Sequence, residues 1–256
     1  MSSPTDERIE NERTFHNAIL ESQARKKLVG AYSIAQASED WYQNSLIANS
    51  RDAAILEYGC GQHSYAAFAV KKGAKSVLGI DISDVAIEIS NRNCREILAG
   101  EESQIKKLRF ERMNAEALDV PDNQFDLVCG RAILHHLDFS KCFKEIHRVL
   151  KPGGKGIFVE PLGHNAFINW YRNRTPELRT PDEHPFMSTD FLQIEQLYSK
   201  VEVQYFHLSS LILIPLTKVM NVTKFVGVFD SFDKLLFKVF PFLRKQAWSC
   251  VITMTK

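Results

Sequence analysis

Paired cysteines are absent from this sequence. Its five cysteines stand singly, with no Cys-x-x-Cys pair and no cysteine–histidine cluster of zinc spacing. A disulfide framework is therefore not expected, and neither is a metal. Scattered reduced thiols are typical of a cytoplasmic protein.

A strong net charge and a membrane-crossing segment are also absent. With 32 basic and 31 acidic residues the formal charge is +1, so the chain as a whole does not attract nucleic acid. Residues 1–11 are polar and acidic rather than a basic segment before an apolar core, so a secretory signal is not expected. Pro215, Lys218 and Lys224 interrupt the apolar run late in the chain, which leaves no stretch of about 20 residues to cross a bilayer.

What the chain does contain is enough apolar sequence for one sizeable α/β domain, since 45% of its 256 residues are hydrophobic. Residues 54–58 form a short apolar run, Gly59-Cys60-Gly61 follows, and residues 65–72 are amphipathic. This pattern predicts a strand, a tight turn and a helix. Because glycine lets the backbone approach a ligand, we expect a nucleotide-sized crevice at the carboxyl end of the strand.

An acidic residue supports this interpretation one strand further on. Residues 76–80 predict a second strand, and Asp81 follows it, about 20 positions beyond the glycine turn. A carboxylate at that place can accept both hydroxyls of a ribose. The pair alone is weak evidence, because glycine turns with an acid nearby occur by chance.

Further motifs follow in a recognisable order. Glu57-x-Gly59-x-Gly61 is followed by Asp81, then by Asn114-Ala115-Glu116, then by Phe125-Asp126-Leu127-Val128. Over residues 55–161 the chain is similar to class I S-adenosylmethionine-dependent methyltransferases, in particular to small-molecule enzymes of types 11 and 25. A dinucleotide fingerprint would need a third glycine near Ser64, and the methyltransferases' usual third glycine is His63 here.

The resemblance implies S-adenosyl-L-methionine as the cofactor. The Asn114 side-chain oxygen and the Ala115 N–H would then face the adenine. Arg131 would pair with the methionine carboxylate, or else be solvated. The candidate cofactor-binding residues are Glu57, Gly59, Cys60, Gly61, Asp81, Ile82, Asn114, Ala115, Glu116, Gly130 and Arg131.

Helix and strand patterns alternate along the chain. Helices are predicted at 83–98 and 140–150, and strands at 108–111, 125–129, 156–160, 201–208 and 249–255. Such alternation predicts a parallel sheet with helices on both faces. The resemblance implies a Rossmann-like fold with a seven-stranded, mostly parallel sheet that ends in an antiparallel hairpin. We expect a helical cap at 1–50 and a methyltransferase domain at 51–256, with an acceptor loop at 161–190 and an apolar insertion at 209–247.

The long connection after the fifth strand is predicted to build the acceptor pocket, because it leaves the sheet on the ligand side. Candidate substrate contacts are Tyr32, Trp41, Tyr42, Trp170, Tyr171, Arg174 and Arg179. The aromatic residues can equally be packing residues, and the arginines can be solvated. Histidines titrate near neutral pH, so the candidate catalytic bases are His135, His136, His164 and His184. One of the adjacent pair must point away from the pocket.

The insertion predicts one amphipathic helix. Asp233, Lys234 and Lys238 lie opposite an apolar stripe made of Phe229, Phe232, Leu235, Leu236, Val239, Phe240 and Leu243. Such a stripe can lie on a membrane surface, close over a lipophilic substrate or pack a partner. We favour burial against its own domain, which is the commonest arrangement.

The predicted reaction is methyl transfer from S-adenosylmethionine to an oxygen, nitrogen or carbon of a small molecule, with S-adenosylhomocysteine as the other product. Three alternatives remain. An NAD(P)-dependent oxidoreductase would share the crevice. A nucleic-acid methyltransferase would need an Asn/Asp-Pro-Pro-aromatic tetrapeptide that the chain lacks. A non-catalytic or membrane-surface binding protein would keep the fold without turnover. The sequence defines neither the acceptor nor the oligomeric state.

Overall fold

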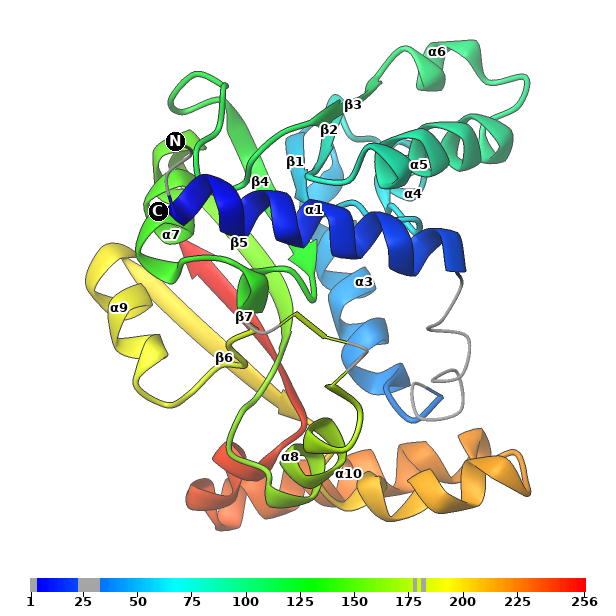
Figure 1. Ribbon diagram of the computed structural model, residues 1–256, viewed down its shortest axis with the longest axis vertical. Helices are drawn as coiled ribbons and strands as arrows, with labels where there is room; N and C mark the ends of the chain where they lie inside the picture. Colours follow the sequence, from blue (N-terminus) through cyan, green and yellow to red (C-terminus); the bar gives the residue numbers. More distant parts are fainter. Residues whose placement is uncertain (1–3, 23–32, 177–178, 181–182) are drawn as a thin grey trace.

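A computed structural model describes residues 4–22, 33–176, 179–180 and 183–256 (Figure 1). Its centre is a seven-stranded sheet with the order β3-β2-β1-β4-β5-β7-β6. The strands are β1 (Ala54–Tyr58), β2 (Ser76–Asp81), β3 (Leu108–Arg112), β4 (Phe125–Arg131), β5 (Leu150–Pro161), β6 (Lys200–Phe206) and β7 (Ser249–Thr255). Strands β1 to β5 are parallel, and β7 runs antiparallel to both β5 and β6. The predicted fold class is confirmed.

The strand order reverses at β1. The chain continues from β1 to β2 and β3 on one side and returns to β4 on the other side. Ligands of open α/β sheets bind at such a reversal, outside the carboxyl ends of the strands. The glycine turn predicted from the sequence therefore lies at the reversal point.

Helices cover both faces of the sheet. On one face α3 (Gln36–Ser50), α4 (Ala66–Lys71) and α5 (Asp84–Ile97) bury Leu46, Val70 and Cys94. On the other face α7 (Phe139–Val149) and α9 (Asp190–Leu197) bury Phe143 and Ile194. Shorter helices are α6 (Glu102–Ile105), η2 (Leu134–His136) and α8 (Ala166–Asn173). Both faces are thereby closed, so ligands have access mainly at the strand ends.

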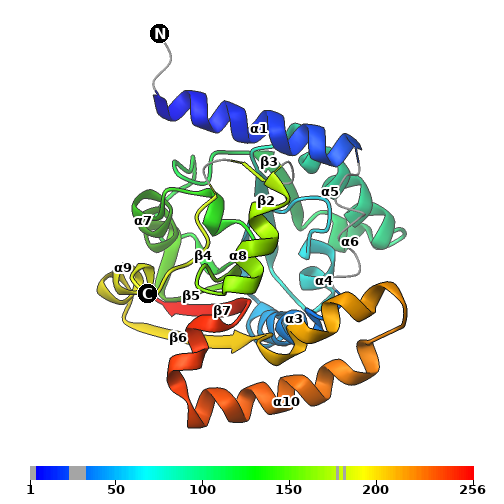
Figure 2. The same cartoon turned by 60° about the horizontal axis from the view of Figure 1, so that its bottom comes forward.

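Helix α1 (Pro4–Ser22) lies across the carboxyl ends of the parallel strands (Figures 1 and 2). Arg13 of α1 pairs with Asp84 beyond β2, at 2.9 Å. Arg8, about one turn earlier, pairs with Glu116 beyond β3 and donates to the His136 carbonyl beyond β4, at 3.2 Å. One helix thus bridges the loops that follow three strands and covers the edge where the glycine turn lies.

The insertion consists of η4 (Ser209–Lys218), α10 (Thr223–Val239) and η5 (Pro241–Gln246), at the end of the molecule away from α1 (Figure 2). A helix forms as predicted, but its orientation differs from the prediction. Asp233, expected on the outer side, is 2% exposed and accepts the N–H groups of Leu208 (2.8 Å) and Ser209 (2.9 Å). Phe232 (51%) and Leu235 (57%) are exposed instead. The favoured burial of the apolar stripe holds for Phe229, Leu236 and Leu243, which are half-buried. The rest of the stripe is exposed, because the N–H groups at the start of η4 hold the Asp233 side of α10 inward.

Strand β5 is longer than predicted. It was predicted to begin at 156, but it begins at Leu150 and includes the Lys151-Pro152-Gly153-Gly154 stretch. Gly153 donates its N–H to the Lys256 carbonyl (3.1 Å), and Lys256 donates its N–H to Gly154 (3.0 Å). These bonds to the end of the chain keep the stretch extended. None of the described helices is long and apolar enough to span a bilayer.

Candidate cofactor and acceptor site

The glycine turn after β1 exposes bare backbone. Gly59 and Gly61 have φ values of +61° and +53°, which residues with a Cβ rarely adopt. Cys60 donates its N–H to the Ile80 carbonyl (2.9 Å) and so fastens the turn to β2. A Cβ on Gly59 would lie 2.8 Å from carbons of Ile133, so this position has no room for a side chain.

Glu57 is buried behind the turn. Its carboxylate accepts the N–H of Tyr65 (2.8 Å), at the start of α4, and the hydroxyl of Ser64. Burial raises the pKa of Glu57 to about 8, although the Ser64 hydroxyl acts to lower it. Both oxygens hold the turn against α4, and a direct cofactor contact stays a prediction.

Asp81 is fixed beside the glycine turn. One carboxylate oxygen accepts the N–H of Gly61 (2.9 Å), and the other accepts the N–H of Ser83 (2.9 Å). Each oxygen has a second lone pair that can accept a ribose hydroxyl. Asp81 and the adjacent Ile82 are both half-buried, so they border the crevice without being sealed in the core.

The predicted adenine contacts follow β3 at the same edge. Asn114 Oδ1 accepts the N–H of Glu116 (2.9 Å), and the Ala115 carbonyl accepts the Tyr58 hydroxyl (3.0 Å). Glu116 is buried and pairs with Arg8 of α1. The Asn114 oxygen thus holds the turn after β3 and has one lone pair left to accept a further hydrogen bond. Glu116 connects α1 to the sheet.

Gly130 and Arg131 end β4. A Cβ on Gly130 would lie 2.9 Å from the Tyr58 carbonyl oxygen, so the strands pack closely there. Arg131 pairs with Glu39 of α3 (3.0 Å) and lies over the Tyr65 ring, 5.5 Å from its centre. A hollow of about 310 Å³ beside it is lined by Gln62, His63, Ser64, Tyr65, Asn93, Cys94, Ile97 and Arg131. Arg131 is therefore held at the rim of this hollow.

The adjacent histidines are both buried. His135 Nδ1 lies 2.7 Å from Glu160 at the end of β5, and Glu160 also accepts the N–H groups of Ile133 (3.0 Å) and Leu134 (2.8 Å). Burial raises the pKa of Glu160 to about 7, while these backbone bonds act to lower it. Our reading of the sequence missed Glu160, although an acid at the end of a strand on the ligand edge was an available signal. His136 points elsewhere, toward α1.

The predicted acceptor residues around α8 differ in exposure. Trp170 and Arg174 are exposed, with the Arg174 guanidinium 4.2 Å from the centre of the Trp170 ring, and Tyr171 is half-buried. Arg179 donates to the Thr175 carbonyl (2.7 Å) and so ties the loop to the end of α8. Arg174 can thus meet a ligand from solvent, whereas Arg179 supports the loop.

The two loop histidines are also tied to the loop. His164 Nε2 accepts the N–H of Ser188 (3.0 Å), and His184 Nε2 lies 3.1 Å from Asp190. The His184 side chain is 55% exposed. His184 also donates its backbone N–H to the His135 carbonyl (2.7 Å), so the loop is tied to η2. The catalytic roles of the histidines stay predictions.

The candidate substrate contacts that precede β1 differ in burial. Tyr32 lies outside the described residues. Trp41 is half-buried, whereas Tyr42 is fully buried with its ring 5.3 Å from the ring of Tyr65. Tyr42 is therefore a core residue, in agreement with the packing alternative, because α3 packs on the face of the sheet. Helix α1, which belongs to the predicted cap at 1–50, covers the carboxyl ends of the strands.

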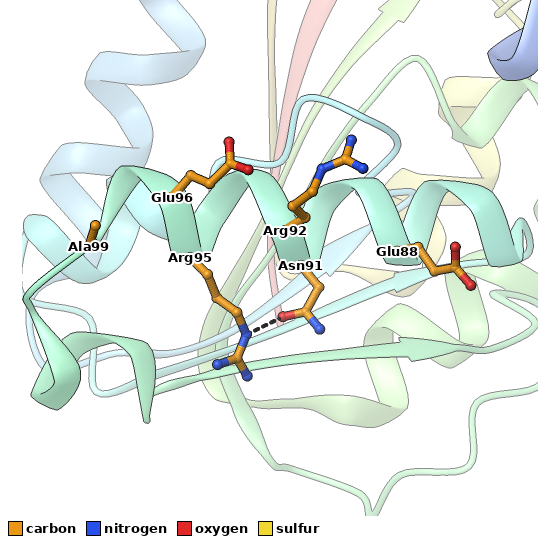
Figure 3. A pocket seen from close by; sticks show the side chains of 6 residues that line it. All are labelled: Glu88, Asn91, Arg92, Arg95, Glu96 and Ala99. Carbon is orange, nitrogen blue, oxygen red and sulfur yellow. Dashed lines mark hydrogen bonds between the residues drawn. The ribbon is translucent and has the colours of Figure 1, made fainter.

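A separate shallow hollow lies on the outer face of α5, lined by Glu88, Asn91, Arg92, Arg95, Glu96 and Ala99 (Figure 3). Arg95 donates to Asn91 (2.8 Å), and the other side chains spread along the helix. Because these groups do not converge on one point, we assign no site there.

Comparison with known proteins identifies the domain. Residues 56–158 match the family model described as a methyltransferase domain. The chain is 36% identical over 126 residues to the sterol 24-C-methyltransferase erg6 of Aspergillus fumigatus, covering 49% of this chain and 31% of that protein. It is 26% identical over 129 residues to the uncharacterized methyltransferase YcgJ of Bacillus subtilis, covering 50% and 48%. The chain thus spans less than half the length of each of these relatives.

A solved structure supports the same fold. Geranyl diphosphate methyltransferase in complex with GPP and sinefungin has a TM-score of 0.59 at 13% identity, over 85% of this chain and 78% of that one. The match of residues 56–158 to a methyltransferase domain agrees with the resemblance carried by the ordered motifs.

Proposed function

We propose that this protein transfers the methyl group of S-adenosyl-L-methionine to a small acceptor with a large apolar part. Cofactor binding is proposed from the geometry at the carboxyl ends of β1 and β4, where the strand order reverses. The Gly59 turn offers bare backbone, and Asp81 is oriented by two N–H groups while keeping lone pairs for a ribose. These residues fit the cofactor, with Asp81 at the ribose and Arg131 near the methionine carboxylate.

The chain's own contribution to the reaction is alignment and exclusion of water. The bound cofactor supplies a methyl group on a positively charged sulfur, which is already reactive. Holding the acceptor in line then accounts for most of the catalysis, and no strong base is required. Helix α1 covers the strand ends, and Glu160 fixes η2 beside the glycine turn through the N–H groups of Ile133 and Leu134. This agrees with the burial of the histidines nearest the crevice.

The apolar part of the acceptor is proposed from the insertion. Its exposed apolar side chains are Ile212, Leu216, Val219, Met220, Phe225, Val228, Phe232, Leu235, Val239, Phe240 and Phe242. Such surfaces mark interaction sites, and exposed Lys224, Lys234 and Lys238 would add attraction to anionic lipids. Ile168 of α8 packs in one cluster with Val222 and Val226, so the acceptor loop adjoins the insertion. Two of the relatives carry names with lipophilic substrates, a sterol and geranyl diphosphate.

Calorimetry with S-adenosylmethionine and S-adenosylhomocysteine tests the cofactor half. We expect one site per chain and no comparable affinity for NAD(P)H. Absence of cofactor binding would contradict the proposal. Binding without transfer of labelled methyl to any component of lipid and aqueous metabolite extracts would favour the non-catalytic alternative.

Cosedimentation with anionic vesicles tests the insertion. Leu235→Ser should reduce vesicle binding, whereas Leu192→Ser, which changes a comparably exposed leucine on α9, should not. Equal binding by both variants and wild type would remove the membrane contact from the proposal and leave the methyl-transfer part standing.

A further inference from the structure

Three side chains meet between α1 and η2, outside the cofactor contacts. Glu12 and His16 lie one turn apart on α1, and His136 comes from η2. Glu12 Oε2 is 3.3 Å from His16 Nε2 and 3.5 Å from His136 Nδ1. One ligand-type atom from each residue lies within 4.8 Å of the other two. Two imidazoles and a carboxylate therefore converge on one small volume.

The Glu12 carboxylate and His136 Nδ1 are buried, and the Thr180 side chain also lies beside Glu12. Glu12 and His136 are 7% and 6% exposed. Both Glu12 oxygens and His136 Nδ1 are buried without a hydrogen-bond partner among the described residues. An uncompensated buried carboxylate costs several kcal/mol, so a native structure usually supplies it with a cation or a donor. Arg8, one turn before Glu12 on α1, is engaged by Glu116 and the His136 carbonyl, and the adjacent Arg13 is engaged by Glu10 and Asp84.

The separations match those between ligands of a tetrahedral metal ion. Nitrogen and oxygen ligands lie about 2.1 Å from zinc, and tetrahedral geometry then places neighbouring ligand atoms about 3.4 Å apart. The two separations from Glu12, 3.3 and 3.5 Å, agree with that value and are too long for good hydrogen bonds.

We propose that Glu12, His16 and His136 bind a divalent metal ion of the zinc class, with one coordination position left for water or another oxygen ligand. The protein ligands come from the cover helix and from the loop after β4. Metal binding therefore fastens α1 over the crevice edge. The site does not depend on the methyl-transfer proposal.

Glu183 is the outer partner of this site rather than a fourth ligand. Its Oε1 lies 3.9 Å from His136 Nε2, the ring nitrogen that faces away from Glu12. Its Oε2 is engaged by Arg172 (2.7 Å) and Arg179 (3.6 Å). A carboxylate on the far nitrogen of a ligating histidine favours the tautomer that leaves the near nitrogen free. At 3.9 Å Glu183 is too far for a direct hydrogen bond, so we expect it to act on His136 through its charge.

The test uses the full chain after removal of metal with a chelator. Zn²⁺ titration by calorimetry should give one site per chain, and Co²⁺ should give the strong visible absorption of a four-coordinate ion. His16→Ala and Glu12→Gln should each weaken Zn²⁺ binding at least about 100-fold, and Glu183→Gln about 10- to 100-fold. Zn²⁺ should raise the melting temperature of wild type but not of His16→Ala.

Matched controls separate this site from surface binding. Glu10→Gln changes an exposed glutamate on the same helix, and His147→Ala changes a histidine of α7 outside the group. Both should bind Zn²⁺ like wild type. Because the His16 side chain is 22% exposed, His16→Ala should fold even if Glu12→Gln does not. Absence of a stoichiometric site in wild type, wild-type affinity in folded His16→Ala, or equal loss in the controls would overturn the proposal.

Discussion

The cofactor half and the acceptor half of the site are assembled in different ways. In the cofactor half, Gly61 bonds to Asp81, only 20 positions away, and Glu57 bonds to Tyr65, 8 positions away. Around the acceptor side, the acceptor-loop residue His184 donates its N–H to the His135 carbonyl, 49 positions away (184 − 135), and Asn165 bonds to Gln246 over 81. The first half is a local strand–turn–strand unit, whereas the second depends on distant segments that meet only in the folded chain. Mutations should therefore separate the two halves.

Gly59→Val should have the largest effect on the cofactor half. Valine resists a φ of +61°, and its Cβ would lie 2.8 Å from Ile133, which together should cost about 2–5 kcal/mol of stability. Cofactor binding should be lost in whatever fraction folds. Denaturant unfolding and calorimetry measure both effects. Gly100→Val is the control, because Gly100 also has positive φ (+83°) but open space around it. Gly100→Val should be destabilised less and should bind the cofactor normally. Normal cofactor binding by Gly59→Val would show that the Gly59 turn is not part of the cofactor site.

Asp81→Ala should have the next largest effect. Loss of a charge-assisted acceptor at the ribose should weaken S-adenosylmethionine binding by about 1–3 kcal/mol, or about 5- to 150-fold in Kd. Glu96→Ala, at an exposed position on α5, should leave the Kd unchanged. Unaltered affinity in Asp81→Ala, measured by calorimetry, would remove Asp81 from the site.

Asp233→Ala tests the insertion, which belongs to the acceptor side of the site. The substitution leaves the N–H groups of Leu208 and Ser209 without their carboxylate, which should cost about 1–3 kcal/mol of stability. Cofactor affinity should remain at the wild-type level, because the insertion lies away from the glycine turn. Lys234→Ala, at the next and exposed position, should change neither quantity. A lowered cofactor affinity in folded Asp233→Ala would show that the two halves are coupled.

His184→Ala should have the smallest effect on stability and acts on the acceptor alone. The exposed ring contacts Asp190 in the loop, so we expect a higher acceptor KM or a lower kcat with unchanged cofactor Kd. Arg179→Ala should act in the same direction but also loosen the loop, because Arg179 bonds to the Thr175 carbonyl. Steady-state kinetics beside calorimetry distinguishes these outcomes. Wild-type kinetics in both variants would make the loop a surface feature without a part in the reaction.

The sequence by itself determined the central sheet and the place of the cofactor edge. The apolar run before Gly59, the glycine turn and the acid at the end of β2 are local requirements of one strand–turn–strand unit, so short windows of sequence carry them. The Ser83 cap of α5 is of the same kind, since its hydroxyl accepts the N–H of Ala86 (3.0 Å) three positions later. These features were predicted because each depends on neighbours in the chain.

The tertiary structure alone decided which faces of the helices meet the rest of the protein. Helical periodicity predicted the helix α10 but put Asp233, which is held by the start of η4, on the outer side. The group of Glu12, His16 and His136 has no signal in sequence spacing, because 120 residues separate His16 from His136 in the numbering (136 − 16). These three side chains meet only in the folded protein, because the sheet brings the strand ends together and α1 lies across them. Long-range packing, rather than local preference, therefore decides which residues come into contact.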